Sequence, residues 1–171
     1  MADLKLRTAT LSDMDAVETV LRRSYAALLP ADYPPSVLVT ALPVMVRAQP
    51  ALLSSGSYFV VERAGQIVGC GGFTLNAPGG DAVTDGLAHI RHVAVDPDAL
   101  RLGVAARILQ HCFATARAVG LHRFEALSTL TAVPFYAAQG FVEIEPVELR
   151  FPGDIPFPAI RMQRDARLHI T

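Results

Sequence analysis

A strand, a tight loop and a helix start rich in small residues follow one another between residues 93 and 109. The strand ends at Asp96-Pro97, and Gly103 and Ala105 open the expected helix. Small side chains let a ligand approach the backbone closely, and the free N–H groups and positive dipole end of a helix N-terminus bind anions such as phosphate. From the residues alone, two interpretations stay open: a phosphate site to which Arg101 adds a charge, or an ordinary strand–helix connection with small residues for packing.

Other common cofactor motifs are missing from the sequence. It holds no G-x-x-x-x-G-K-[ST] loop, and Lys5 is its only lysine. The glycines of Gly69-Cys70-Gly71-Gly72 fall inside an expected strand and open no helix, which argues against a dinucleotide fingerprint and favours a bulge or close backbone packing. Cys70 and Cys112 lie far apart in apolar surroundings, so we expect buried thiols and no zinc site.

Hydrophobic patterning predicts the elements that position these residues. Alternating residues indicate strands, and apolar positions at three- and four-residue steps indicate helices. The order predicts an α/β fold with a mixed sheet of about six to seven strands flanked by about four helices, in which hairpins give antiparallel pairs and a crossover helix gives a parallel one. Strands are expected near residues 4–8, 58–63, 66–74, 87–95, 123–127, 142–150 and 158–163, and helices near 12–29, 36–48, 103–119 and 131–139.

The expected strand at residues 87–95 carries several titratable side chains. Imidazoles have a pKa near ~6.5 and can exchange protons at neutral pH, whereas a cation such as Arg91 is expected on a solvated sheet face. Strict alternation predicts that His89, Arg91 and Val93 share one face, and that Ile90, His92 and Ala94 share the other.

Composition bounds the class of protein. The chain has 171 residues, 51 % hydrophobic and 18 % charged, so we expect one domain over residues 1–171 with a substantial core. A net charge of −1 argues against a general nucleic-acid surface. The sequence lacks the roughly 18 consecutive apolar residues of a membrane helix. It also shows no secretory signal, so we expect a cytoplasmic protein.

Two motifs stand in order on the expected elements. The first is Val93-Ala94-Val95-Asp96-Pro97 with Leu100-Arg101-Leu102-Gly103-Val104-Ala105, and the second is Phe135-Tyr136-Ala137-Ala138-Gln139-Gly140-Phe141. In these motifs, and in its element order over residues 3 to 164, the chain resembles the GCN5-related N-acetyltransferase (GNAT) superfamily. One position departs from the family pattern: Leu100 stands where the loop usually has Gln or Arg, and Arg101 follows one place later.

The resemblance implies the GNAT fold and acetyl-CoA as the acyl-donor cosubstrate, with no metal. Backbone groups of Val93 and Val95 would pair with the pantetheine arm and the acetyl carbonyl. The pyrophosphate would bind to the loop and helix start, at Arg101, Leu102, Gly103, Val104, Ala105 and Ala106.

The resemblance also implies direct attack of an amine on the thioester. Tyr136 matches the family's usual proton donor to the leaving thiolate, since a phenol is protonated at pH 7. A base helps because a protonated amine has no lone pair. His89 stands near the position where family members often carry a glutamate base, and His92 and Glu125 are further candidates.

The resulting prediction is an N-acetyltransferase that acts on a primary amine of a small molecule or a protein. The first two helices and the loops near residues 76–86 and 151–157 would frame the acceptor pocket. The alternative is a non-catalytic acyl-CoA-binding sensor or interaction module of the same fold. The identity of the acceptor, a longer acyl donor and a homodimer stay open at this point.

Overall fold

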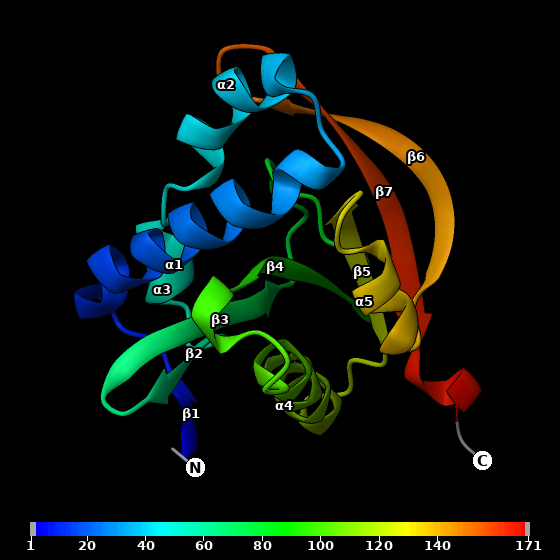
Figure 1. Cartoon of the computed structure of the whole chain (residues 1–171). Coiled ribbons are helices and arrows are strands. Elements are labelled where there is room, and N and C mark those ends of the chain that lie inside the picture. The colour runs from blue at the N-terminus through cyan, green and yellow to red at the C-terminus, as the bar shows by residue number, and fades with distance from the viewer. Residues whose placement is uncertain (1–2, 170–171) are drawn as a thin grey trace.

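The computed structural model describes residues 3–169 and contains a seven-stranded sheet in the order β1-β2-β3-β4-β5-β7-β6 (Figure 1). β4 and β5 are parallel, and the other neighbouring pairs are antiparallel, which confirms the expected mixed α/β sheet. The strands are β1 (Leu4–Thr8), β2 (Tyr58–Arg63), β3 (Gln66–Thr74), β4 (Leu87–Val95), β5 (Arg123–Thr129), β6 (Val142–Phe151) and β7 (Ile155–Asp165). The α-helices are α1 (Met14–Leu28), α2 (Pro35–Met45), α3 (Pro50–Leu53), α4 (Val104–Ala118) and α5 (Val133–Ala138), and short 3-10 helices occupy Leu11–Asp13, Leu29–Ala31, Pro97–Ala99 and Ala166–His169.

Helices cover both faces of the first half of the sheet, with α1 and α4 on opposite sides (Figure 1). β2 shows the reason, because side chains alternate between the two faces of a strand. Phe59 and Val61 pack into the cluster that contains α4, whereas Tyr58 and Val60 pack into the cluster that contains α1. A third apolar cluster holds α2 against Phe157 of β7. The first half of the sheet is therefore packed on both faces up to its centre.

The centre of the sheet is split. β4 pairs with β5 only over Leu87–His89, opposite Arg123–Glu125, and beyond that point the two strands diverge (Figure 1). β5 continues to pair with β7, and β4 continues to pair with β3. The second half of β4 therefore leaves one of its edges open, next to the N-terminus of α4.

A bulge in the second half of β4 breaks the expected alternation of side chains. Between the pairs Cys70–Ala94 and Gly72–Arg91, β4 holds one residue more than β3, and His92 adopts a positive φ of 48°. The prediction that Val93 shares a face with His89 was wrong, because the extra residue turns the following side chains over. Val93 instead packs on the α4 side, in the same cluster as Ile90.

The glycines of β3 confirm the expected close packing. A Cβ atom at Gly69 would lie 2.3 Å from Val104 of α4, and one at Gly71 would lie 2.8 Å from Val93 of the bulge. Glycine therefore lets α4 and β4 approach β3 at these positions. The start of α4 and the bulge of β4 both pack directly against β3 as a result.

Replacing Gly72 by alanine is expected to destabilise the fold by about 2 kcal/mol or more, because the new Cβ has no room. It would lie 2.2 Å from the backbone oxygen of Ser57 and 2.6 Å from Cα of Tyr58, and backbone cannot give way as a side chain can. Gly80→Ala is the matched control, since a Cβ there meets nothing within 4 Å. Denaturant unfolding checks this, and equal stability of the two variants would contradict it.

The helix expected at residues 36–48 ends three residues early, a separate short helix follows it, and the last strand begins earlier than expected. α2 ends at Met45 and α3 begins at Pro50, because the residue before a proline avoids helical angles and Gln49 is extended (φ −98°, ψ 117°). β7 begins at Ile155, ahead of the expected residue 158. Its early prolines are tolerated because β5 joins β7 only at Ala159, so the strand has one open edge there. Within residues 3–169, the helices fall short of the length and apolar character that a membrane crossing requires.

Candidate active site

A first cavity of about 290 Å³ lies in the gap between β4 and β5. Its walls come from the open edge of β4, the end of β5, the start of α5, the start of α4 and the overlying α1. Its lining is mostly apolar, with hydroxyl groups and one imidazole placed among the apolar side chains. The lining residues are Ser24, Tyr25, Leu28, Leu29, Ile90, His92, Val93, Ala94, Val95, Leu100, Ala105, Leu127, Ser128, Thr129, Thr131, Ala132, Phe135 and Tyr136.

The loop before α4 has the backbone geometry that favours an anion. Gly103, the N-cap of α4, has φ 77°, and Arg101 also has a positive φ of 66°. The first internal bond of α4 runs from the Arg107 N–H to the Gly103 carbonyl, so the preceding N–H groups have no acceptor inside the helix. A Cβ at Gly103 would meet nothing within 4 Å, so open space lies in front of this position. The helix start is thus free to receive a negatively charged ligand.

This loop is joined to the first cavity. Leu100 and Ala105 belong to its lining, and Val93 and Val95 line it along the open edge of β4. Leu100, at the position where the family usually has Gln or Arg, is 40 % exposed. Of the cofactor-binding residues predicted from the sequence, Val93, Val95 and Ala105 line this cavity. The others are outside its lining, in the adjoining loop and first turn of α4: Arg101, Leu102, Gly103, Val104 and Ala106.

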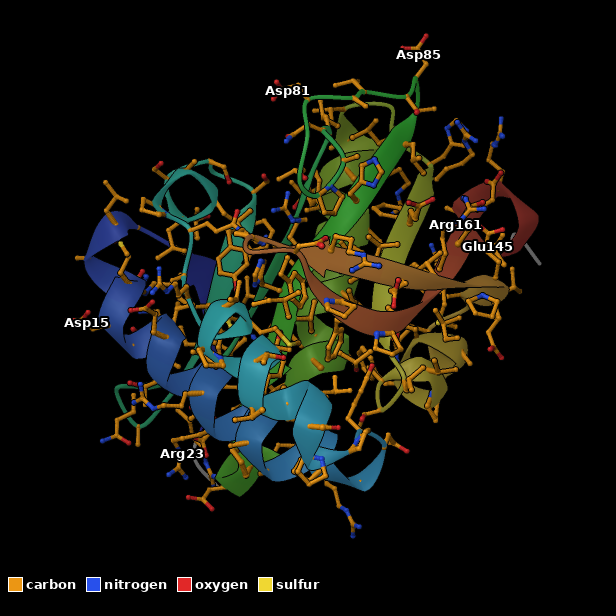
Figure 2. All side chains as sticks on the ribbon, turned by 90° about the horizontal axis from the view of Figure 1, so that it is seen from above. Asp15, Arg23, Asp81, Asp85, Glu145 and Arg161 are labelled. Atoms are coloured by element: carbon orange, nitrogen blue, oxygen red, sulfur yellow. The ribbon has the colours of Figure 1, made fainter. Side chains whose placement is uncertain are left out.

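Acidic residues of the same loop are held by α1. Arg23 of α1 donates to Asp96 at 2.8 Å and to Asp98 at 3.0 Å, and its guanidinium lowers the pKa of the Asp96 carboxyl below its usual range. Figure 2 shows Arg23 on the outer side of α1. Its single charge offsets one of the two carboxylate charges and so reduces their repulsion of an anion at the neighbouring helix start.

Tyr136 lies on α5 with its side chain in the wall of the first cavity. It is 7 % exposed and packs edge-on against Phe135 and Phe141. Burial raises the pKa of its phenol well above the ordinary value, so the hydroxyl keeps its proton at neutral pH. Nearby, the buried Thr131 hydroxyl also lines the cavity and has no hydrogen-bond partner among the side chains and backbone described for residues 3–167. The sequence interpretation missed Thr131, which lies four residues before the first residue of the Phe-Tyr motif.

His89 is placed apart from Tyr136. It is 5 % exposed, and its Nδ1 atom lies 3.7 Å from Oε1 of Glu125. Burial lowers its pKa more strongly than the Glu125 carboxylate raises it. Glu125 in turn accepts from Gln163 at 2.9 Å and contacts Arg161. The wall of the first cavity begins one residue after His89, at Ile90.

His92, in the bulge, is the imidazole that reaches the cavity wall. Arg91 donates to Oε1 of Gln49, so the Gln49 amide nitrogen is the atom that faces Nε2 of His92 at 3.3 Å. An amide nitrogen is a donor, which makes this Nε2 an acceptor and leaves the ring proton on Nδ1. Burial lowers the pKa of His92 to about 4, with Arg91 contributing. His92 is therefore a neutral hydrogen-bonding group at pH 7.

A second cavity, of about 160 Å³, continues from the first on the other side of His92. The two share Tyr25, Ile90, His92, Leu127 and Thr129. The segments expected to frame an acceptor pocket meet here: the first two helices, the loop at residues 76–86 and the turn at residues 151–157. They contribute Tyr25, Met45, Pro78, Phe151 and Phe157, and Arg91 and Leu149 complete the lining.

Comparison with known proteins agrees with this geometry. Residues 22–141 match the acetyltransferase (GNAT) family, although no curated protein matches the sequence. Similar structures include a GCN5-related N-acetyltransferase from Rhodopseudomonas palustris (18 % identity, TM-score 0.77, covering 96 % of this chain and 97 % of that one). The PaiA N-acetyltransferase from Thermoplasma acidophilum, in complex with coenzyme A, has 11 % identity and a TM-score of 0.71, over 95 % of this chain and 99 % of that one. The N-acetylglutamate synthase from Neisseria gonorrhoeae, complexed with coenzyme A and N-acetyl-glutamate, has 20 % identity and a TM-score of 0.63, over 97 % of this chain and 36 % of that one.

At these identities the structures establish a shared fold. The family match covers well over half of the chain, from within α1 to the end of the Phe-Tyr motif. The predicted resemblance is confirmed: this chain belongs to the acetyltransferase (GNAT) family.

Proposed function

We propose that this chain is an N-acetyltransferase that transfers the acetyl group of acetyl-CoA to a primary amine. One observation carries the proposal: a single cavity connects the open helix start of α4, the unpaired edge of β4 and the phenol of Tyr136. Acetyl-CoA is a long molecule with phosphates at one end and a thioester at the other, and these three features suit its two ends and its middle.

The donor would bind mainly through backbone groups. The N–H groups at Gly103, Val104, Ala105 and Ala106 would hold the pyrophosphate, helped by the positive end of the α4 dipole. The open edge of β4 at Val93 and Val95 would pair with the pantetheine arm. Such contacts depend on backbone geometry, so a leucine at position 100 is compatible with binding.

The chemical step needs a neutral amine on one side of the thioester and a hydrogen-bond donor on the other. The amine nitrogen attacks the acetyl carbon, a C–N bond forms, and the C–S bond breaks. The nitrogen gives up one proton to solvent, and the departing CoA sulfur takes up one proton to leave as the thiol. Tyr136 keeps its proton at neutral pH, so it can donate to the sulfur as negative charge develops there. The second cavity, across His92, would hold the rest of the acceptor.

Binding and turnover measurements separate this function from its rival. Isothermal titration with acetyl-CoA measures binding, and thiol release over a panel of primary amines measures transfer. Binding together with thiol release for at least one amine is the expected result. Binding without turnover on every acceptor would favour the non-catalytic sensor, and absence of binding would contradict both.

With a simple alkyl amine such as phenethylamine as the acceptor, kcat/KM is expected to rise by about tenfold per pH unit up to about pH 9, because an alkyl amine titrates near pH ~10. His92, with its pKa lowered to about 4 by burial, is already neutral across this range, and Tyr136 stays protonated. We therefore propose that the acceptor enters as the free amine. The prediction of His89 as base gives a different profile: because burial lowers its pKa, the rate would level off from about pH 7 upward. Such a plateau would contradict free-amine entry.

A further inference from the structure

Arg91 is a buried cation whose partners are all neutral. It is 8 % exposed, and its two terminal nitrogens donate to the Thr74 hydroxyl and to Oε1 of Gln49, each at 3.1 Å. Within residues 3–169, no Asp or Glu forms an ion pair with it. Other arginines do find carboxylates, namely Arg7, Arg23, Arg150, Arg161 and Arg167. The prediction that Arg91 lies on a solvated face was wrong, because its side chain is enclosed under the 76–86 loop and α3.

An arginine side chain cannot deprotonate to escape this burial. Burying a charge without a counter-ion is costly unless another group completes the pairing. The guanidinium has five N–H donors, and the hydrogen bonds to Thr74 and Gln49 use two of them. The remaining donors match the paired oxygens of a carboxylate.

Arg91 lines the cavity that the proposed function assigns to the acceptor, so a carboxylate of the acceptor could reach it. It lines the second cavity, and it also lines an adjoining third cavity of about 330 Å³ with Gln49, Thr74 and Asn76. Among the residues that the structure describes, neither lining includes an Asp or Glu. The nearest acids of the neighbouring loop, Asp81 and Asp85, are exposed and point outward (Figure 2). Arg91 is therefore the one charged side chain among the described residues that line these two cavities.

The rest of the second cavity is apolar. Beyond Arg91 and His92, its walls are formed largely by hydrocarbon and aromatic surface, from Met45, Pro78, Leu149, Phe151 and Phe157. His92, the residue after Arg91, lines both cavities. The cation is therefore next to the point where the acceptor cavity meets the thioester cavity. This proximity suits a molecule whose amine and carboxylate are carried by one carbon atom.

We propose that Arg91 binds the carboxylate of the acceptor, and that the acceptor is an α-amino acid with an apolar side chain. The inference rests on the proposed transfer to an amine and specifies its substrate class. The carboxylate completes the pairing of the Arg91 guanidinium. The α-amine then lies beside His92 toward the first cavity, and the apolar side chain packs against Met45, Phe151 and Phe157.

The test compares phenylalanine with phenethylamine, which has the same ring and amine but lacks the carboxylate. Binding is measured by isothermal titration in the presence of saturating CoA, and thiol release from acetyl-CoA is measured separately. The parent protein is expected to bind phenylalanine at least tenfold more tightly than phenethylamine. Arg91→Met is expected to abolish this preference, because methionine keeps the apolar stem and removes the charge. Arg22→Met, an exposed change of the same charge on α1, is the matched control and should retain the preference.

The outcomes separate this inference from the proposed function. Equal binding of the two ligands by the parent protein, or an undiminished preference in Arg91→Met, would overturn the role of Arg91. A carboxylate preference in binding without thiol release from any amine would uphold Arg91 and reject the transferase. Thiol release from phenethylamine as fast as from phenylalanine would uphold the transferase and reject the amino-acid acceptor. If Arg91→Met does not fold, Arg91→Lys replaces it; it keeps the charge without the planar fork and should reduce the preference without abolishing it.

Discussion

The Tyr136→Phe variant is expected to lose about 10²–10⁴-fold in kcat while its affinity for acetyl-CoA changes little. The estimate follows from the usual contribution of general acid catalysis, and it applies if chemistry limits turnover. Removal of one oxygen leaves the ring in its edge-on contacts with Phe135 and Phe141. Tyr136 makes no side-chain hydrogen bond within the described residues that would couple its hydroxyl to the fold. The change should therefore appear in the rate of transfer rather than in stability.

Tyr33→Phe provides the matched control. The Tyr33 hydroxyl donates to the Pro158 carbonyl at 2.6 Å and accepts from the Leu130 N–H at 2.8 Å, so its loss should lower the free energy of unfolding by about 1–3 kcal/mol. Tyr33 is outside the lining of the first and second cavities, and the Tyr33→Phe variant should therefore retain kcat. A folded Tyr136→Phe protein with full kcat and parental single-turnover transfer would reject Tyr136 as the acid. Single-turnover measurements separate chemistry from product release.

The parts of the site that could be predicted from the sequence are those set by local chain chemistry. Asp96-Pro97 ends β4, and the glycine at 103 permits the left-handed turn from which α4 begins. The Phe-Tyr motif and Gly140 fix α5 and its end in the same way. Each of these signals lies within a few residues of the feature it controls. This is why the two motifs could be picked out from the sequence, and in the structure residues of both line the cavity at the β4–β5 gap.

Long-range packing decided what the sequence interpretation missed. Alternation along β4 fails at His92 because a residue is inserted opposite β3, and the only local signal was the glycine run at 69–72 in the partner strand. Arg91 is buried because Gln49, which is more than 40 residues away in the chain, closes over it. The early end of the helix expected at residues 36–48 had a local signal in Pro50, but the placement of Gln49 against Arg91 had none.

The prediction of a catalytic base likewise depends on both local sequence and long-range packing. The family resemblance assigned His89 by its position along the strand, and that assignment stays a prediction. In the structure His89 faces Glu125 on β5. The imidazole that lies in the cavity wall is that of His92, in the bulge three residues later on β4. A residue's place in a motif fixes its backbone position, whereas the direction of its side chain depends on how the strands on either side are registered.

Replacing Gly103 by valine is expected to weaken acetyl-CoA binding at least about tenfold, equivalent to ~1.4 kcal/mol. Gly103 has φ 77°, a conformation that a β-branched residue adopts only under strain. Its α-carbon also faces open space at the helix start, where a branched side chain would stand between the N–H groups and a pyrophosphate. Both effects act on the same loop, so isothermal titration with acetyl-CoA measures their sum.

Gly120→Val isolates the strain from the loss of binding. Gly120 follows the other end of α4, has φ 85°, and would likewise place its Cβ in open space. The two variants should therefore lose similar stability, whereas only Gly103→Val should lose affinity. S-acetylpantetheine, which lacks the pyrophosphate, sharpens the comparison: its kcat/KM should fall far less in Gly103→Val than that of acetyl-CoA, because the contact that valine blocks is absent from that donor. Unchanged affinity of folded Gly103→Val for acetyl-CoA would reject the helix start of α4 as the phosphate site.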